Sequence, residues 1–258
     1  MKKILAIAVA LLLVMSLVAC GSKQSEVDDN NEATVNTDLS YGDFTYAVNE
    51  AGDYEITGYT YAGATDSIVV VPSEIDGRPV TGIGDDAFKA VTSLSAIIIP
   101  SSVTYIGNFA FYGCTDLTAI TIPDTVTSIG TGAFWGCDAL RAIDMSDTVK
   151  TIGDYAFMNC EKLVSITFPE TLESIGEGAF WGCETLSEVT LPASVKSIAD
   201  AAFMYCSALA KITVKNAEMQ IGAKAFASCA DSLTLVAAAT STAKTYAEAE
   251  DVNFTVAE

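Results

Sequence analysis

Apolar residues recur along this chain with a period of 23 residues. Isoleucine returns at that interval from Ile83 to Ile221, and an Ala-Phe pair returns in step with it from Phe88 to Phe226. Seven consecutive units therefore share one register, without insertions at these positions. The repeated residues are Ile83, Ile106, Ile129, Ile152, Ile175, Ile198 and Ile221, with Phe88, Phe111, Phe134, Phe157, Phe180, Phe203 and Phe226.

Within each unit the spacing of the apolar residues changes once. From Ile106 to Leu117 the apolar residues follow the spacing of one or two short helical turns. Beyond them, Ile120 and Ile122 alternate with small or polar residues, which predicts a strand that ends at Pro123. Each unit is therefore predicted to contain one short helical turn and one strand.

A single unit of this kind has an apolar face that only a neighbouring unit can cover. Stacked units place parallel strands about 4.8 Å apart and bury the apolar columns in a continuous core. The pattern predicts a repeat solenoid over residues 83–235, built from seven 23-residue units of β-strand plus short helical turn, with a parallel β-sheet on one face. An N-terminal cap over residues 44–82 and a C-terminal cap over residues 236–258 are expected to cover the terminal coils.

The two caps have their own predicted elements. Phe44–Val48 and Tyr54–Thr57 are expected to form a hairpin, and Ile68–Pro72 resembles the strand of a preceding repeat. At the other end, the sequence predicts a short helix over Thr242–Glu250 and a last strand over Asn253–Val256.

These repeats resemble the BspA-type leucine-rich repeats. The family pattern is roughly Ile-Gly-x-x-Ala-Phe-x-x-Cys-x-x-Leu-x-x-Ile-x-Ile-Pro, and Cys114 to Pro123 is a close copy of its second half. The resemblance extends from about Phe44 to the C-terminus. It implies a leucine-rich-repeat-like solenoid and a cell-surface or secreted interaction protein, often concerned with adhesion, whose ligand varies among relatives.

The first residues have the layout of an export signal. Lys2 and Lys3 precede an apolar run, Ile4–Val14, that is short for a membrane-spanning helix. Leu17–Cys20 resembles a bacterial lipobox, which implies a lipoprotein signal peptide over residues 1–20 and a diacylglycerol anchor on Cys20. Ordinary signal cleavage with a free Cys20 is the alternative. The chain is thus expected to be extracytoplasmic, anchored to the bacterial membrane or cell surface by its lipid only.

The polar composition of residues 21–43 predicts a flexible tether, because the segment has too few apolar residues to stabilise a folded state. The whole chain has a formal net charge of −20. Loss of Lys2 and Lys3 with the signal would bring it to about −22, with 11 basic residues against 33 acidic ones. Such a charge repels nucleic acid, so no nucleic-acid partner is expected. The acidity is otherwise explained by solubility.

Six cysteines occupy one position of the repeat. That position faces the core between the Phe and Leu columns, where a reduced thiol serves as a small hydrophobe. Pairwise disulfides between stacked coils are the alternative. Metal binding is not expected, because closely spaced ligand pairs are absent and the chain contains no histidine. The cysteines are Cys114, Cys137, Cys160, Cys183, Cys206 and Cys229.

No catalytic residues and no cofactor are predicted. The lack of histidine removes Ser-His-Asp and Cys-His catalysis. Most acidic residues have structural explanations: those at the third position of a unit are expected to cap the short helical turn, and those after the strand suit a turn. The first group is Asp85, Asp154, Glu177 and Asp200, which share their position with Asn108 and Thr131; the second is Asp124, Asp147 and Glu170.

Two outward-facing columns are candidate binding surfaces. One runs along the predicted strands and contains Thr121, Asp144, Thr167, Thr190 and Thr213. It is either a contact face or a plain sheet surface, since threonine favours strands on its own account. The other directly follows the core phenylalanines and contains Tyr112, Trp135, Met158, Trp181 and Met204. Aromatic and Met residues suit an interaction site, although each could simply pack on the next coil.

The function predicted from these features is cell-surface binding or adhesion. A protein or glycoconjugate partner would contact one face of the solenoid. The alternative is a carbohydrate-capture module of a nutrient-uptake system, in which Trp135 and Trp181 stack on sugar rings. An enzyme is not expected.

Overall fold

The structure is a computed structural model that describes residues 39–60 and 68–257. The predicted signal peptide, Cys20 and residues 21–38 of the predicted tether lie outside the described residues. In the part of the chain that is described, no helix is both long and apolar enough to cross a membrane.

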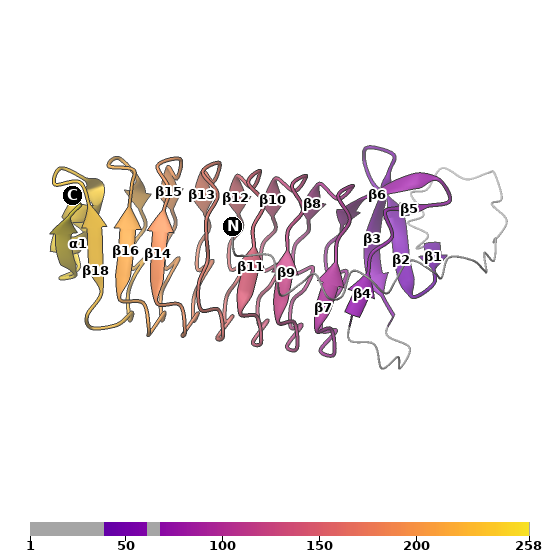
Figure 1. Ribbon diagram of the computed structural model, residues 1–258, viewed down its shortest axis with the longest axis horizontal. Coiled ribbons are helices and arrows are strands. Elements are labelled where there is room, and N and C mark those ends of the chain that lie inside the picture. Colours follow the sequence, from indigo (N-terminus) through magenta and orange to yellow (C-terminus); the bar gives the residue numbers. More distant parts are fainter. Residues whose placement is uncertain (1–38, 61–67, 258) are drawn as a thin grey trace, which may run out of the picture. The chain divides into compact units, whose positions relative to one another are not determined.

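The described chain is built almost entirely from short strands. It contains 19 strands and one helix, most of which are labelled in Figure 1. The elements are β1 (Leu39–Tyr41), β2 (Phe44–Val48), β3 (Tyr54–Tyr59), β4 (Ile68–Val70), β5 (Glu74–Ile75), β6 (Arg78–Ile83), β7 (Ala96–Ile98), β8 (Tyr105–Ile106), β9 (Ala119–Thr121), β10 (Ser128–Ile129), β11 (Ala142–Asp144), β12 (Thr151–Ile152), β13 (Ser174–Ile175), β14 (Glu188–Leu191), β15 (Ser197–Ile198), β16 (Lys211–Val214), β17 (Gln220–Ile221), β18 (Thr234–Ala237), α1 (Thr242–Ala249) and β19 (Asn253–Val256).

The 23-residue register is confirmed by strand pairing. Ile83 of β6 pairs in parallel with Ile106 of β8, and Ile106 pairs with Ile129 of β10. The series continues through β12, β13, β15 and β17 at the same interval. These short strands form one long parallel ladder, in the order β3-β6-β8-β10-β12-β13-β15-β17, that joins every coil to the next (Figure 1). The sequence had not predicted this ladder as a sheet.

The predicted strands form a second parallel face. β4 pairs with β7, β9 with β11, and β14-β16-β18-β19 form a four-stranded sheet. The prediction fails at Thr167, which lies in no strand although it is exposed. We attribute the interruption to Phe168. This larger side chain takes the place of Ile122 in the repeat, and its buried ring packs edge-on against Phe180 at 5.6 Å.

The predicted short helical turn forms as a series of hydrogen-bonded turns rather than as a helix. Each coil has two residues with positive φ in this segment, such as Phe109 (54°) and Gly113 (70°), and this conformation interrupts an α-helix. The backbone groups instead bond to the next coil: the Phe111 N–H donates to the Ala133 carbonyl at 2.7 Å, and the Gly113 N–H to the Trp135 carbonyl at 2.8 Å. The N–H groups between them bond within the segment, as that of Tyr112 does to the Phe109 carbonyl at 3.0 Å, so inter-coil hydrogen bonds alternate with local turn hydrogen bonds.

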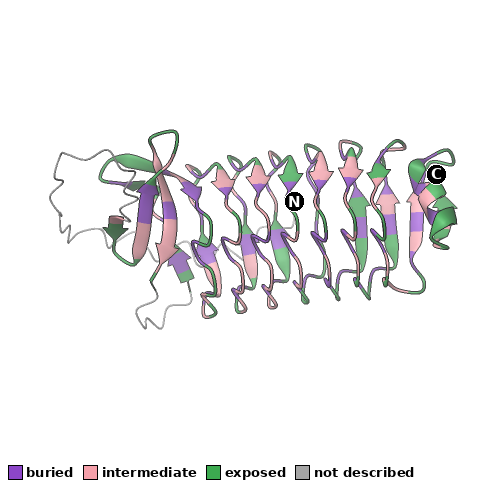
Figure 2. Cartoon of the chain, turned by 180° about the vertical axis from the view of Figure 1, so that it is seen from behind, coloured by how far each residue is buried: buried purple, intermediate pink, exposed green. Residues whose placement is uncertain are grey.

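The core lies between these ladders and runs through every coil (Figure 2). The repeated Phe side chains are fully buried from Phe88 to Phe203, and Phe226 is 3% exposed. Neighbouring rings stack, with centroids 5.0–5.8 Å apart along the column. Stacking of this kind adds about 0.5–1.5 kcal/mol per pair to the burial of apolar area. The Phe column is thus a principal source of stability.

Both caps contain the predicted elements. β2 and β3 form the antiparallel hairpin, and β4 joins β7 as the strand of a preceding coil. At the C-terminal end, Ser241 caps α1 by accepting from the Lys244 N–H, and β19 adds to β18. One boundary differs: β1 pairs with β2, so the folded N-terminal cap already includes residues 39–43, which the sequence had assigned to the tether.

Candidate interaction surfaces

The strand column forms the first solvent-facing surface. Thr121 and Asp144 occupy paired positions of β9 and β11, and Thr190 and Thr213 are paired on β14 and β16. All are exposed except Thr213, which is half-buried. Their neighbours on the buried side, such as Ile120, alternate with them as a half-buried strand requires. The predicted outward orientation of these residues is correct. Thr167, at the same repeat position, is also exposed, although it does not lie in a strand.

The column after the core phenylalanines forms the second surface. Tyr112, Trp135, Met158, Trp181 and Met204 are all half-buried. Successive members are in contact at one end, where the rings of Tyr112 and Trp135 meet edge-on at 5.5 Å. Tyr112 and Trp135 therefore pack on each other, and every member of the column keeps part of its surface in solvent.

Three aromatic residues that sequence reasoning missed join this column. The Phe109 ring lies 6.1 Å from Tyr112 and 6.5 Å from Trp135, and the Tyr155 ring lies 6.0 Å from Trp135. Tyr205 contacts Trp181 at 5.3 Å and is 47% exposed. We call the combined surface the aromatic ridge. Its members are Phe109, Tyr112, Trp135, Tyr155, Met158, Trp181, Met204 and Tyr205.

Glycines make room for two of these rings. Phe109 leans over Gly132 of the next coil, where a Cβ atom would lie only 2.4 Å from the ring. Tyr155 leans over Gly178, where a Cβ atom would lie 2.8 Å from its ring. The signal in the sequence was the alternation of aromatic residue and glycine at the fourth position of successive units.

A lysine lies at the N-terminal end of the aromatic ridge. Lys89 occupies the repeat position of Tyr112 one coil earlier, and its Nζ lies 6.0 Å from the Phe109 ring centroid and 5.8 Å from that of Tyr112. The same ammonium forms an ion pair with Asp86 at 2.9 Å. One cation of the chain thus contacts both an aromatic surface and a carboxylate.

Three acidic residues at the third repeat position, Asp85, Asp154 and Asp200, bind the next coil rather than capping a helix. The Glu177 N–H donates to Asp154 Oδ1 at 2.8 Å, and the Ala223 N–H donates to Asp200 Oδ1 at 2.8 Å. Asp85 and Asn108 accept in the same way from the following coil. The predicted role as acceptors of backbone N–H groups is correct, but the predicted partner is wrong because the short helix does not form.

The Glu177 carboxylate also accepts a hydrogen bond from the Tyr155 hydroxyl. This bond raises the pKa of Tyr155 above its ordinary value, since ionisation would place two negative charges together. The interaction holds one ridge ring beside a carboxylate.

The cysteine column is buried from Cys114 to Cys206 and half-buried at Cys229, and each described thiol is free. Every one donates to the carbonyl of a Phe in the preceding coil, for example Cys160 Sγ to Phe134 O at 3.3 Å. Burial raises the pKa of Cys114 to about 12 and that of Cys160 well above its ordinary range. The column therefore supplies weak hydrogen bonds as well as volume, and thiols of raised pKa are poor nucleophiles.

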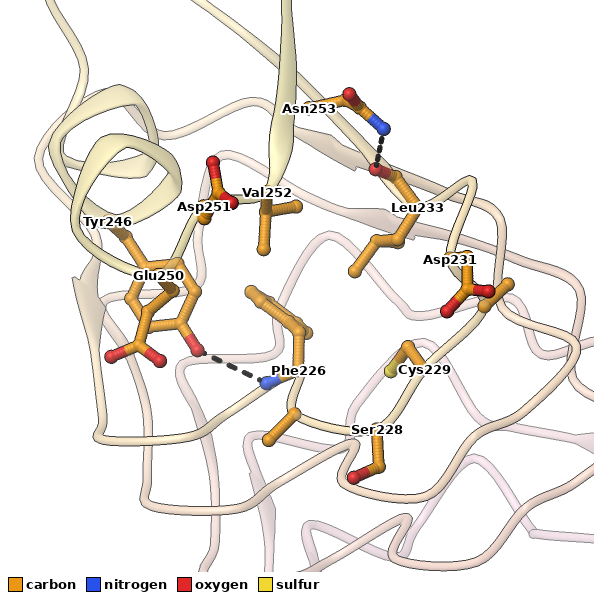
Figure 3. Close-up of a pocket in the computed structure, with 12 residues that line it drawn as sticks. Phe226, Ser228, Cys229, Asp231, Leu233, Tyr246, Glu250, Asp251, Val252 and Asn253 are labelled. Atoms are coloured by element: carbon orange, nitrogen blue, oxygen red, sulfur yellow. Dashed lines mark hydrogen bonds between the residues drawn. The ribbon is translucent and has the colours of Figure 1, made fainter.

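A pocket of about 420 Å³ lies at the C-terminal end of the repeats (Figure 3). There the Tyr246 hydroxyl accepts from the Phe226 N–H at 3.3 Å, and the Asn253 side chain donates to the Leu233 carbonyl at 3.1 Å. Half-buried Cys229 lines the pocket, and burial raises its pKa to about 12. The pocket thus offers a protonated thiol and no histidine to activate it.

Within residues 39–60 and 68–257, no group of three or more His, Cys, Asp and Glu side chains is placed to hold a metal ion. The perturbed pKa values in this part of the chain belong to the column thiols, to tyrosines and to Glu173, whose pKa is lowered by its hydrogen bond to Lys196. The expectation that the chain is not an enzyme stays a prediction.

Comparison with known proteins supports the same architecture. The family model for the BspA type leucine rich repeat region matches residues 81–150 and 127–249, with six copies. No curated protein matches the chain.

Solved structures of similar proteins include a leucine rich cell surface protein from Faecalibacterium prausnitzii A2-165, at 34% identity and a TM-score of 0.68. The match covers 76% of this chain and 53% of that one, so this chain spans about half the length of that protein. A leucine-rich repeat protein from Bacteroides ovatus ATCC 8483 matches at 25% identity and a TM-score of 0.53, covering 77% and 70% of the two chains. A T. pallidum leucine rich repeat protein shares the fold at 24% identity and a TM-score of 0.51, covering 86% and 98%. With the repeats matched over most of the chain, this protein belongs to the BspA-type leucine-rich repeat family.

Proposed function

We propose that this protein is a cell-surface binding or adhesion protein, held by a lipid on Cys20, that contacts a protein or glycoconjugate through a face of its solenoid. The similar Faecalibacterium prausnitzii protein is described as a cell surface protein, which favours an extracytoplasmic location. The lipobox-like Leu17–Cys20 favours anchoring through the lipid alone. Catalysis and a cofactor form no part of this proposal.

One observation carries the binding role. Outward side chains keep a fixed register from coil to coil, as in the pairing of Asp144 with Thr121 and of Thr213 with Thr190. A surface of this kind presents many groups at regular spacing, while the buried columns maintain its geometry. Repeat solenoids use such extended faces to bind partners.

The binding role is tested by capture of extracellular proteins and glycans on the exported chain from Gly21. Two surface variants locate the contact: Thr121→Lys with Thr190→Lys on the strand face, and Trp135→Ala with Trp181→Ala on the aromatic ridge. A partner lost with only one variant identifies its face. Partners that bind both variants and an unfolded chain equally would refute a specific surface.

The second candidate function is carbohydrate capture. Half-buried Trp135 and Trp181 keep part of each indole in solvent, two coils apart on one surface. Sugars stack on such rings, although Trp135 already contacts Phe109, Tyr112 and Tyr155. Binding to a glycan array should then be lost in the Trp135→Ala/Trp181→Ala variant. Unchanged glycan binding by that variant would eliminate this function.

The lipid anchor has a separate test. Mass spectrometry of the membrane fraction should find the acyl modification on Cys20, and Cys20→Ala should release the protein from membranes. A Cys20→Ala protein that remains membrane-bound would show that anchoring has another origin.

A further inference from the structure

The aromatic ridge already binds one ammonium group from its own chain. Lys89 Nζ lies within 6.0 Å of the Phe109 and Tyr112 ring centroids, and Asp86 neutralises it at 2.9 Å. Attraction between a cation and a ring face is appreciable at such distances. A flanking carboxylate supplies the second half of the arrangement. The Lys89 contact is therefore an internal example of what this surface can bind.

The rest of the aromatic ridge also has aromatic rings flanked by carboxylates, but no cation of the described residues lies over these rings. Tyr205 is 47% exposed beside Trp181, and no second Lys or Arg of residues 39–60 and 68–257 lies over a ridge ring. Asp154 and Asp200 are exposed and use Oδ1 for the next coil, which leaves Oδ2 able to accept from a ligand. Aromatic surface and carboxylates are thus both accessible there.

The local charge around the aromatic ridge is strongly negative. Five turn segments carry it: residues 107–117, 130–140, 153–163, 176–186 and 199–209. Together they contain seven carboxylates and a single basic residue, Lys162. The carboxylates are Asp116, Asp138, Asp154, Glu161, Glu177, Glu184 and Asp200.

We infer that the aromatic ridge is the contact surface of the proposed binding function, and that its partner is a protein segment rich in lysine and arginine. Cationic side chains of the partner lie against the ring faces of Trp135, Trp181 and Tyr205. The flanking carboxylates pair with them, as Asp86 pairs with Lys89. A neutral glycan would leave these carboxylates without counter-charge, and an anionic partner would be repelled.

The test uses a fluorescent nona-arginine peptide and the exported chain from Gly21. Trp135→Leu with Trp181→Leu keeps the net charge and removes the indoles. We expect it to weaken peptide binding by about fivefold or more, the size expected for losing two partly exposed cation–π contacts. The matched control is Thr121→Leu with Thr190→Leu on the strand face, which also keeps the charge and should bind like the parent. Thermal unfolding identifies any variant that has lost its fold.

A second pair of variants tests the internal cation. Lys89→Ala and Lys150→Ala each remove one positive charge, and both residues are exposed. Because Lys89 competes for the Phe109 and Tyr112 rings, Lys89→Ala should raise affinity for nona-arginine more than Lys150→Ala does. This comparison decides the question alone if the Trp variants fail to fold.

Equal affinity of the parent and the folded Trp variant, or equal effects of the two Lys variants, would overturn the inference and leave only bulk electrostatic attraction. The proposed binding function has a separate outcome. In that outcome, an extracellular protein binds in a way that depends on Thr121 and Thr190 but not on the aromatic ridge. This result would support the proposed binding function and refute the assignment of a partner to the ridge.

Discussion

Phe134 and Phe157, 23 residues apart in the chain, lie face to face with ring centroids 5.2 Å apart and planes inclined by 2°. Both rings are fully buried. Each coil therefore covers the aromatic ring of the coil before it, and the stability of one unit depends on the presence of its neighbours.

Truncating this column should be strongly destabilising. We expect Phe134→Ala to lower the free energy of unfolding by about 3–5 kcal/mol, through lost burial and a cavity between two rings. Urea denaturation followed by circular dichroism measures the change. The control is Val164→Ala, at a side chain that is 50% exposed, which should change stability little. Comparable losses in the two variants would contradict the stacked core.

The inter-coil role of the third-position carboxylates can be tested at Asp154. Asp154→Ala leaves the Glu177 N–H without its 2.8 Å acceptor, and we expect a loss of about 0.5–1.5 kcal/mol for this solvent-exposed bond. Asp154→Asn keeps an acceptor oxygen and should retain most of the stability. Asp144→Ala, on the exposed strand face, serves as the control for loss of a carboxylate. Hydrogen exchange at Glu177 should increase only in Asp154→Ala.

The buried thiols should make the fold sensitive to alkali. Burial raises the pKa of Cys114 from about 9 to about 12, so the folded state favours the neutral thiol. The stabilisation that the neutral Cys114 thiol provides is complete at pH values below the pKa of this thiol in the unfolded chain. It is lost as the pH rises toward the pKa of the thiol in the folded chain. We expect the free energy of unfolding to decline between about pH 9 and pH 12.

Cys114→Ala should show a shallower decline over this interval, measured by urea titrations at several pH values. Thr190→Ala should keep the slope of the parent, since tyrosine and lysine titration is common to all three proteins. Identical slopes in parent and Cys114→Ala would exclude a contribution from the thiol.

The C-terminal cap depends on a tyrosine hydroxyl. Tyr246→Phe removes the acceptor of the Phe226 N–H, which the structure places 3.3 Å from the hydroxyl oxygen. We expect faster hydrogen exchange in residues 224–230 and a loss of about 1 kcal/mol or less, because the bond is long. Exchange in the central coils should be unchanged. Uniformly faster exchange would mean that the cap stabilises the whole solenoid rather than its last coil.

Much of the fold could be predicted because each unit repeats its apolar side chains. The spacing of Ile106 and Ile129 predicted that they stack in register on neighbouring coils, and the alternation around Ile120 predicted the outward Thr121. The hairpin, the helix α1 and the strand β19 carried ordinary local signals. These features depend on the size of each side chain and on the spacing of apolar residues, and both can be seen in the sequence.

The conformation of the turn segment could not be predicted in the same way. Apolar residues between Ile106 and Leu117 have helical spacing, but Phe109 and Gly113 have positive φ. The N–H groups of Phe109, Phe111 and Gly113 donate to carbonyls of the next coil, as that of Phe111 does to Ala133. Only the stacked structure provides those acceptors.

The candidate interaction surfaces also combine features that the sequence predicted with features that required the structure. The sequence by itself determined which side chains point outward, Trp135 and Thr121 among them, because a 23-residue register assigns each position to one column. Only the tertiary structure decided that Phe109 and Tyr155 complete the aromatic ridge and that Asp154 bonds the next coil. These ring contacts and this hydrogen bond form between neighbouring coils. They depend on the backbone conformation of each coil and, for the rings, on the space left by Gly132 and Gly178.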